Sequence, residues 1–188
     1  MGYEFELKFR ANPEILEKMG RDFPADEVFR MRTTYYDTED GALSEKRLTL
    51  RCRRENDISV CTLKTPTGGV GRGEFEIRCD SIEKAIPELC KLSGVELPHS
   101  GLVPVCGAEF TRQAKTLVRP DCILELALDQ GVLTGGGKEI PLFEVEVELK
   151  AGSQESAVAY AQALAAGYGL IPETKSKFRR ALDLAKGV

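Results

Sequence analysis

The chain has 188 residues, of which 42% are hydrophobic and 30% are charged, and its net charge is −4. This length and hydrophobic content are typical of one folded domain, so we expect a single domain over residues 1–188. The near balance of acidic and basic groups excludes a general attraction to nucleic acid or to an anionic membrane surface. The sequence contains no long apolar run and no signal-peptide pattern, so we expect a soluble, cytoplasmic protein without membrane partners.

Apolar and charged side chains alternate strictly along residues 3–10 and again along residues 143–150. A period of two places Glu4, Glu6 and Lys8 on one face of a strand and the apolar side chains on the other. Carboxylates that share a strand face repel each other unless a cation lies opposite. A divalent metal bound to a polyanion would meet this need.

Turn residues, helix caps and periodicity divide the rest of the chain into four helices and a series of strands. Helices are predicted at residues 14–21, 81–92, 153–166 and 173–186. Strands are predicted at residues 28–37, 47–54, 58–65, 72–79, 103–118, 122–129 and 140–150. The helices are sufficient to cover the apolar side of an antiparallel sheet.

Charged residues keep to one side of most predicted strands, as Arg51 and Arg53 do opposite Leu50 and Cys52. One explanation is an open sheet with a solvated face. A solvated face usually includes Thr, Ser and Gln, whereas this side is almost wholly Arg, Lys, Glu and Asp, which favours a closed lumen. We therefore expect an α+β fold with a closed eight-stranded antiparallel β-barrel, or tunnel, whose lumen is charged and whose flanks carry helices. Arg30, Arg32 and Lys150 are expected to face solvent.

The six cysteines are scattered and form no Cys-x-x-Cys motif, so neither a zinc site nor a redox site is predicted. We expect reduced cysteines that pack as small hydrophobic residues, which agrees with a reducing cytosol. The charged face offers a different chemistry. Arg and Lys bind phosphate oxygens, and carboxylates hold Mg²⁺ or Mn²⁺, which bridges to the phosphate. Metals bound to the phosphate and to a water favour phosphoryl transfer.

Seven motifs occur in one order along the chain. They are Glu4-x-Glu6-x-Lys8, Tyr35-Tyr36-Asp37-Thr38, Leu50-Arg51-Cys52-Arg53, Thr62-Leu63-Lys64, Arg72-x-Glu74-x-Glu76, Glu144-x-Glu146-x-Glu148 and Ser176-Lys177-Phe178-x-Arg180. Together they resemble the CYTH superfamily, the triphosphate tunnel metalloenzymes, over nearly the whole chain. The resemblance implies an eight-stranded antiparallel tunnel. It also implies an activity among inorganic triphosphatase, thiamine triphosphatase, RNA triphosphatase and class IV adenylate cyclase.

The resemblance assigns roles to individual residues and implies Mg²⁺ or Mn²⁺ as the cofactor. Catalytic roles go to Glu4, Glu6 and Lys8. The implied metal ligands are Glu4, Glu6, Glu144 and Glu146, with Glu148 and Asp129 as further candidates. The implied triphosphate-binding residues are Lys8, Arg51, Arg53, Lys64, Arg112, Lys175 and Lys177. Glu74, Glu76 and Glu125 either balance lumen arginines or bind metal.

Our functional prediction is a metal-dependent triphosphatase that removes the terminal phosphate of inorganic tripolyphosphate or a related small-molecule triphosphate. The chain has no Trp and only 7% aromatic residues, so no stacking surface for thiamine or a base is evident. A class IV-type adenylate cyclase and a thiamine triphosphatase are the enzymatic alternatives. A non-enzymatic polyphosphate-binding module is the alternative from another class, and it would not need clustered carboxylates. The sequence leaves the oligomeric state open.

Overall fold

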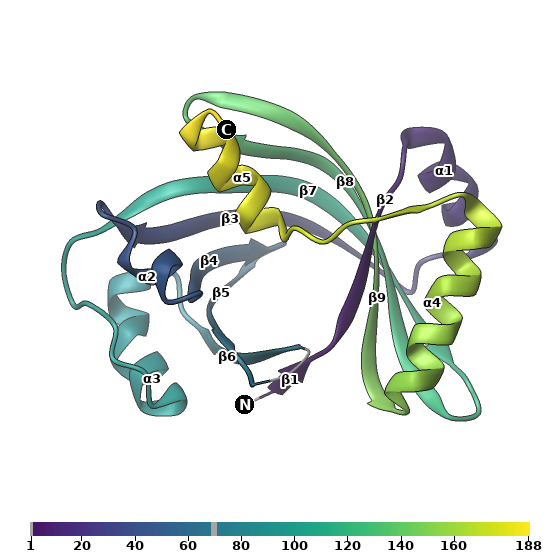
Figure 1. Cartoon of the computed structure of the whole chain (residues 1–188), viewed down its shortest axis with the longest axis horizontal. Helices are drawn as coiled ribbons and strands as arrows, with labels where there is room; N and C mark the ends of the chain where they lie inside the picture. The colour runs from purple at the N-terminus through teal and green to yellow at the C-terminus, as the bar shows by residue number, and fades with distance from the viewer. Residues whose placement is uncertain (1, 69–70) are drawn as a thin grey trace.

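The structure is a computed structural model that describes residues 2–68 and 71–188, and these residues form a single curved antiparallel sheet (Figure 1). Their ten strands are β1 (Gly2–Glu4), β2 (Glu6–Arg10), β3 (Glu27–Thr38), β4 (Thr49–Glu55), β5 (Ile58–Pro66), β6 (Arg72–Arg78), β7 (Leu102–Val118), β8 (Cys122–Gly135), β9 (Lys138–Gly152) and β10 (Ile171–Pro172). Their order in the sheet is β1-β6-β5-β4-β3-β7-β8-β9-β2-β10. The predicted α+β class with a large antiparallel sheet is therefore confirmed.

The two ends of the sheet meet at one N-terminal extended segment. Its first part, β1, pairs with β6, so that Glu4 lies opposite Arg72. After Phe5 its second part, β2, pairs with β9. The sheet curls around a central space (Figure 1), but its hydrogen-bonded ladder changes partner at Phe5 and is not continuous. The described residues thus form a ten-stranded, unclosed sheet rather than the closed eight-stranded barrel expected from the sequence.

Five helices occur in the described chain, namely α1 (Pro13–Asp22), α2 (Ala42–Glu45), α3 (Ile82–Ser93), α4 (Gln154–Tyr168) and α5 (Lys177–Lys186). The four long ones match the predicted helices, and the single turn of α2 was not predicted. α5 begins at Lys177 instead of residue 173, because residues 171–172 pair with β2 and Ser176 caps the helix by accepting from the Arg179 N–H. None of the described helices combines the length and hydropathy that crossing a membrane requires.

Three helices cover the outer, apolar face of the sheet. α1 and α4 pack on β8 and β9, and α3 packs on β5 and β6. Leu50 and Leu63, both fully buried, point toward α3, while the alternate residues Arg51 and Arg53 point inward. Period-two alternation therefore separates an apolar outer layer from a charged inner surface.

α5 lies on the inner side of the sheet, since its first residues Lys177 and Phe178 line the central cavity. Phe178 packs against Tyr35 of β3, with ring centroids 5.1 Å apart. The β8–β9 hairpin also approaches α5 closely. A Cβ on Gly135 would lie 2.4 Å from the Ala181 carbonyl oxygen, so only glycine allows this approach. The apolar side chains of α5, Phe178, Ala181 and Leu182, therefore pack against the inner face of β7 and β8 in a separate buried cluster.

All six cysteines lie within the described residues and are free. Cys52 and Cys61 face each other on β4 and β5 and belong to the apolar layer under α3. Burial raises the pKa of the Cys52 thiol, which makes this thiol a poor nucleophile. The packing of reduced cysteines agrees with the expectation from the sequence.

A candidate triphosphate site in the charged cavity

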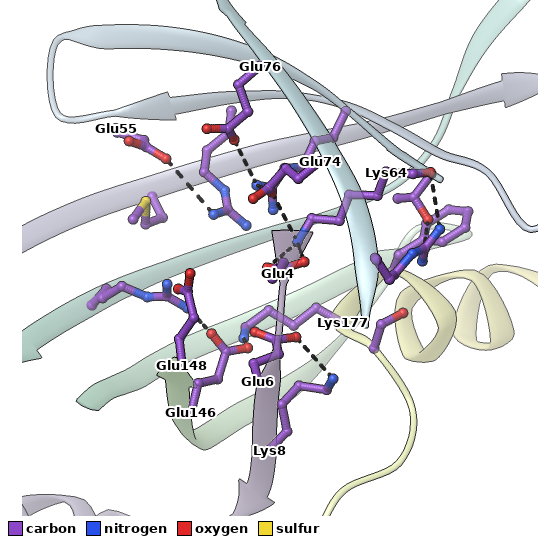
Figure 2. A pocket seen from close by; sticks show the side chains of 18 of the residues that line it. Glu4, Glu6, Lys8, Glu55, Lys64, Glu74, Glu76, Glu146, Glu148 and Lys177 are labelled. Atoms are coloured by element: carbon purple, nitrogen blue, oxygen red, sulfur yellow. Dashed lines mark hydrogen bonds and ion pairs between the residues drawn. The ribbon is translucent and has the colours of Figure 1, made fainter. Parts of the chain in front are cut away.

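The curved sheet and α5 enclose a cavity of about 300 Å³ (Figure 2). Among the described residues, eight acidic and eight basic side chains line it. The acidic ones are Glu4, Glu6, Glu55, Glu74, Glu76, Glu125, Glu146 and Glu148, and the basic ones are Lys8, Arg51, Arg53, Lys64, Arg72, Arg112, Lys150 and Lys177. Such a lining offers binding groups for an anion and for a cation in one space.

Among the lining cations that pair with a carboxylate in the described residues, Arg53 has the longest such contact. Its side chain is 7% exposed, its Nε donates to Thr33 Oγ1 at 2.9 Å, and the carboxylate of Glu55 lies 3.9 Å away. Burial, together with the charges of Arg51 and Arg112, lowers the pKa of Arg53 to about 10. A buried guanidinium under this repulsion would be stabilised by an anionic ligand.

Arg51 also keeps donor capacity for a ligand. Its Nη2 lies 3.5 Å from Glu74 and 3.6 Å from Glu76, and its buried Nε has no hydrogen-bond partner in the described residues. Loosely held, buried donors that point into a cavity are suited to phosphate oxygens.

The N-terminal segment contributes both signs of charge to the cavity. Glu4 lies 2.5 Å from Lys64, and Glu6 lies 3.1 Å from Lys8 (Figure 2). Burial opposes the charged form of Lys8, but Glu6 and Glu146 outweigh it and raise the pKa of this lysine. Lys8 therefore stays protonated and can neutralise phosphate as well as carboxylate.

A row of carboxylates crosses three strands on the cavity side. Glu6 of β2 lies opposite Glu148 of β9, and Glu148 lies opposite Glu125 of β8. Burial raises the pKa of Glu148. Lys150 lies 2.9 Å from Glu148 and 3.6 Å from Glu125, and Lys8 lies 3.1 Å from Glu6. Adjacent like charges are unfavourable in a sheet, whereas hard oxygen donors are the ligands that Mg²⁺ and Mn²⁺ prefer. The donor set of this row fits such a cation.

A second acidic cluster, Asp129, Glu144 and Glu146, has carboxylate oxygens within 4.8 Å of one another. The ammonium of Lys177 lies among them, 2.8 Å from Asp129 and 2.6 Å from Glu146, and it also contacts Glu144. Arg112 adds a bidentate contact to Asp129 with two distances of 2.7 Å. The cluster is therefore balanced by basic side chains of the protein itself.

The charges in this cluster shift its pKa values in opposite directions. Burial disfavours ionised Glu146, but Lys177 and Arg112 hold its pKa well below the usual range. Burial raises the pKa of Glu144 to about 7, although Lys177 and Arg180 oppose the shift. Despite burial, the surrounding carboxylates raise the pKa of Lys177. The network therefore fixes α5 to β8 and β9 through charges that are removed from water.

Most of the predicted site residues are brought together. Those that line the cavity are Glu4, Glu6, Lys8, Arg51, Arg53, Lys64, Arg112, Glu146, Glu148 and Lys177. Asp129 and Glu144 are fully buried behind the lining. Lys175 lies outside it, with a side chain that is 57% exposed and paired with Asp183 at 2.8 Å. Lys150, which we expected to face only solvent, lines the cavity instead.

Sequence reasoning assigned no role to Arg72, Arg180 or Phe110. Arg72 lines the cavity, as Glu74 and Glu76 do. These residues alternate along β6, so the sequence pattern could have placed Arg72 on the same face. Arg180 contacts Glu144 and belongs to the motif that begins at Ser176. The ring of Phe110 lies within 6 Å of three cations, and no sequence pattern indicates this contact.

A curved antiparallel sheet that encloses paired cations and carboxylates defines the class of protein to which this chain belongs. The family model of the CYTH domain matches residues 2–182. The chain belongs to the CYTH domain family, so the resemblance noted in the sequence is confirmed.

An inorganic triphosphatase of Haemophilus influenzae is 28% identical over 190 residues, which include 94% of this chain and 53% of the relative. The chain thus spans about half the length of the curated relative that it matches. A Hippeastrum protein described as an adenylyl cyclase with a dominant triphosphatase activity has a TM-score of 0.68 at 18% identity and covers 100% of this chain and 96% of its own. A Pyrococcus horikoshii protein has a TM-score of 0.65 at 23% identity and covers 97% of this chain and 99% of its own. These likenesses show that the fold is shared.

Proposed function

We propose that the protein is a metal-dependent triphosphatase that hydrolyses the terminal phosphate of inorganic tripolyphosphate. The observation that carries the proposal is the pairing, in one cavity, of weakly compensated buried arginines with a row of cavity-facing carboxylates. The similarity to the Haemophilus influenzae triphosphatase supports the same reaction. A polyphosphate-binding module would need the arginines but would gain nothing from the carboxylate row.

In this proposal Arg51, Arg53 and Lys64 bind phosphate oxygens, and Glu6 and Glu148 hold Mg²⁺ or Mn²⁺. When bound, the metal supplies charge neutralisation and lowers the pKa of a water. The protein orients the phosphate chain with its fixed cations and keeps the reacting end away from bulk water. Lys8, Arg112 and Lys177 add positive charge at the β2, β7 and α5 side of the cavity.

Among the described residues of the lining, two of the three aromatic side chains, Tyr35 and Phe178, cannot stack on an organic group, and the third, Phe29, is partly buried. Tyr35 is 3% exposed and Phe178 is 9% exposed, because their rings pack on each other. Neither offers a free face on which an adenine or a thiamine ring could stack. The cavity of about 300 Å³ is instead lined mainly by charged groups, which matches a bare phosphate chain.

Two finer features belong to the same proposal. We infer that the sheet surrounds the cavity as a closed tunnel would, because β1 pairs with β6 and the next strand of the same segment, β2, pairs with β9. We also infer a reducing, cytoplasmic environment, which the six free cysteines support.

A substrate panel tests the proposal. The full chain is incubated with tripolyphosphate, ATP and thiamine triphosphate in Mg²⁺, Mn²⁺ or Ca²⁺, and orthophosphate, pyrophosphate and cyclic AMP are measured. We expect orthophosphate from tripolyphosphate, with a higher kcat/KM than for ATP. Cyclic AMP and pyrophosphate from ATP, without hydrolysis of tripolyphosphate, would show a cyclase. Tight binding of tripolyphosphate without turnover in any metal would show a binding module.

A further inference from the structure

One aromatic ring is the common neighbour of three cations that come from different elements. Lys177 Nζ of α5 lies 5.3 Å from the ring centroid of Phe110, Arg53 Cζ of β4 lies 5.6 Å away, and Arg112 Cζ of β7 lies 5.8 Å away. Each distance is within the range in which the ring quadrupole attracts a cation. Phe110 is 5% exposed, so these contacts are largely shielded from water.

The backbones of β7 and β8 approach each other closely at Phe110. Phe110 lies opposite Met31 on β3 and opposite Gly131 on β8. A Cβ on Gly131 would lie 2.5 Å from Phe110 Cα and 2.6 Å from Phe110 Cβ. Because no side chain fits at this position, glycine is required for β8 to approach β7 here.

A neutral aromatic ring stabilises these cations in a way that their carboxylate partners do not. Arg112 and Lys177 are held on one side by Asp129 and Glu146, whereas Arg53 has its closest carboxylate at 3.9 Å. A further carboxylate would attract all three but would also repel a phosphate group. The face of a neutral ring attracts cations and leaves their full positive charge available to an anion.

We propose that Phe110 is a positioning residue of the triphosphate site: its ring holds Arg53 beside Arg112 and Lys177, so that Arg53 binds phosphate oxygens where all three cations add positive charge. The inference rests on the proposed function for the identity of the anion. With a weaker ring, Arg53 moves away from Arg112 and Lys177, which their carboxylates hold in place, and the anion must bring it back when it binds. Affinity for the anion therefore falls as the ring quadrupole is weakened.

A fluorination series tests this without changing the shape of the core. The full chain is made with 4-fluoro-, 3,5-difluoro- and 3,4,5-trifluorophenylalanine at position 110, and tripolyphosphate binding is measured by calorimetry without divalent metal, so that no turnover occurs. We expect the Kd to rise stepwise, by about tenfold at the trifluoro ring. Phe75 is the control, since it is also 5% exposed but lies in the outer apolar layer under α3. The same series at Phe75 should change the Kd less than about twofold.

A second measurement does not depend on tripolyphosphate. Trifluorination at position 110 should lower the Tm by about 2 to 4 °C with Arg53 present and by clearly less in the Arg53→Met background. Equal Tm changes in both backgrounds, or a Kd that stays constant or decreases along the series, would overturn the positioning role. If the unmodified protein binds no tripolyphosphate, the proposed function fails, and the Tm comparison still decides whether the ring holds the cations.

Discussion

Glu6 and Glu148 lie directly opposite each other on β2 and β9, and both side chains line the cavity. Opposed carboxylates reduce the stability of a sheet, by about 0.2–1 kcal/mol for a directly facing pair of like charges. Lys8, 3.1 Å from Glu6, and Lys150, 2.9 Å from Glu148, offset part of this repulsion. In the proposed function, a divalent cation held by the two carboxylates would offset the rest.

The first prediction concerns this pair. Glu6→Gln removes one charge with little change of shape, so the metal-free protein should keep its Tm or gain about 1 to 3 °C. Mg²⁺ and Mn²⁺ should no longer raise the Tm, and kcat/KM should fall by about 100-fold or more, since metal catalysis supplies several kcal/mol. Thermal melts with and without metal, followed by phosphate-release kinetics, measure both effects. Glu96→Gln, at an exposed position outside the cavity, is the control. Retained metal stabilisation in Glu6→Gln would exclude Glu6 as a ligand.

The second prediction separates two neighbouring lysines. Lys177→Met leaves Asp129, Glu144 and Glu146 with an uncompensated buried charge, so it should reduce the free energy of unfolding by about 3–5 kcal/mol. Lys175→Ala removes a side chain that is 57% exposed and leaves Asp183 paired with Arg179 at 2.8 Å, so it should cost less than about 1 kcal/mol. Urea unfolding compares the two variants. Phosphate-release kinetics add a second comparison, in which Lys175→Ala should keep its KM for tripolyphosphate. A strongly raised KM in Lys175→Ala would return this lysine to the binding site.

The third prediction follows from the pKa of Glu144, which burial raises to about 7. A carboxyl whose pKa is higher in the folded than in the unfolded protein stabilises the fold at low pH. This contribution is present below about pH 4.5 and is lost as the pH rises through about 7. The shift corresponds to a contribution on the order of 3 kcal/mol. Urea unfolding of the metal-free protein between pH 4.5 and 8 should show this loss in the wild type and not in Glu144→Gln. If the wild type instead gains stability over the variant with rising pH, Lys177 and Arg180 keep Glu144 ionised.

The fourth prediction uses two glycines. Gly131→Ala places a Cβ 2.1 Å from the Glu109 carbonyl oxygen, so β7 and β8 must separate, and we expect a loss of about 1–3 kcal/mol. Gly167→Ala in α4 meets no atom within 4 Å and should stabilise the protein by about 0.5–1 kcal/mol. Chemical denaturation of both variants measures the contrast. Equal stability would show that the β7–β8 contact relaxes without cost.

The local features of this fold were predictable because each depends on a few neighbouring residues. Period-two alternation placed Arg51 and Arg53 on the inner face, and Asn12 before Pro13 located the start of α1, where its Oδ1 accepts from the Ile15 N–H at 2.8 Å. The start of α5 was wrong by four residues, because pairing of β10 with β2 is a long-range contact that the local pattern does not contain.

The same limit applies to the site. Lys175 and Lys177 look alike in the sequence, and only the position of the Ser176 cap decides which of them points into the cavity. Likewise, Glu144, Glu146 and Glu148 alternate along β9, so the sequence pattern places all three on the same face. Their different surroundings depend on the packing of α5 against β8 and β9, and the alternation of residues along one strand does not predict this packing.

The N-terminal extended segment has a consequence for how the chain acquires its structure. β1 can pair with β6 once residue 78 has been synthesised, but β2 must wait for β9, which ends at Gly152. Contacts between residues so distant in sequence slow folding, since loop closure comes before any gain from pairing. Joining of the first and last parts of the sheet should therefore be a late event. Until then, the unpaired edges of β2 and β9 are the surfaces at which a nascent chain is most exposed to aggregation.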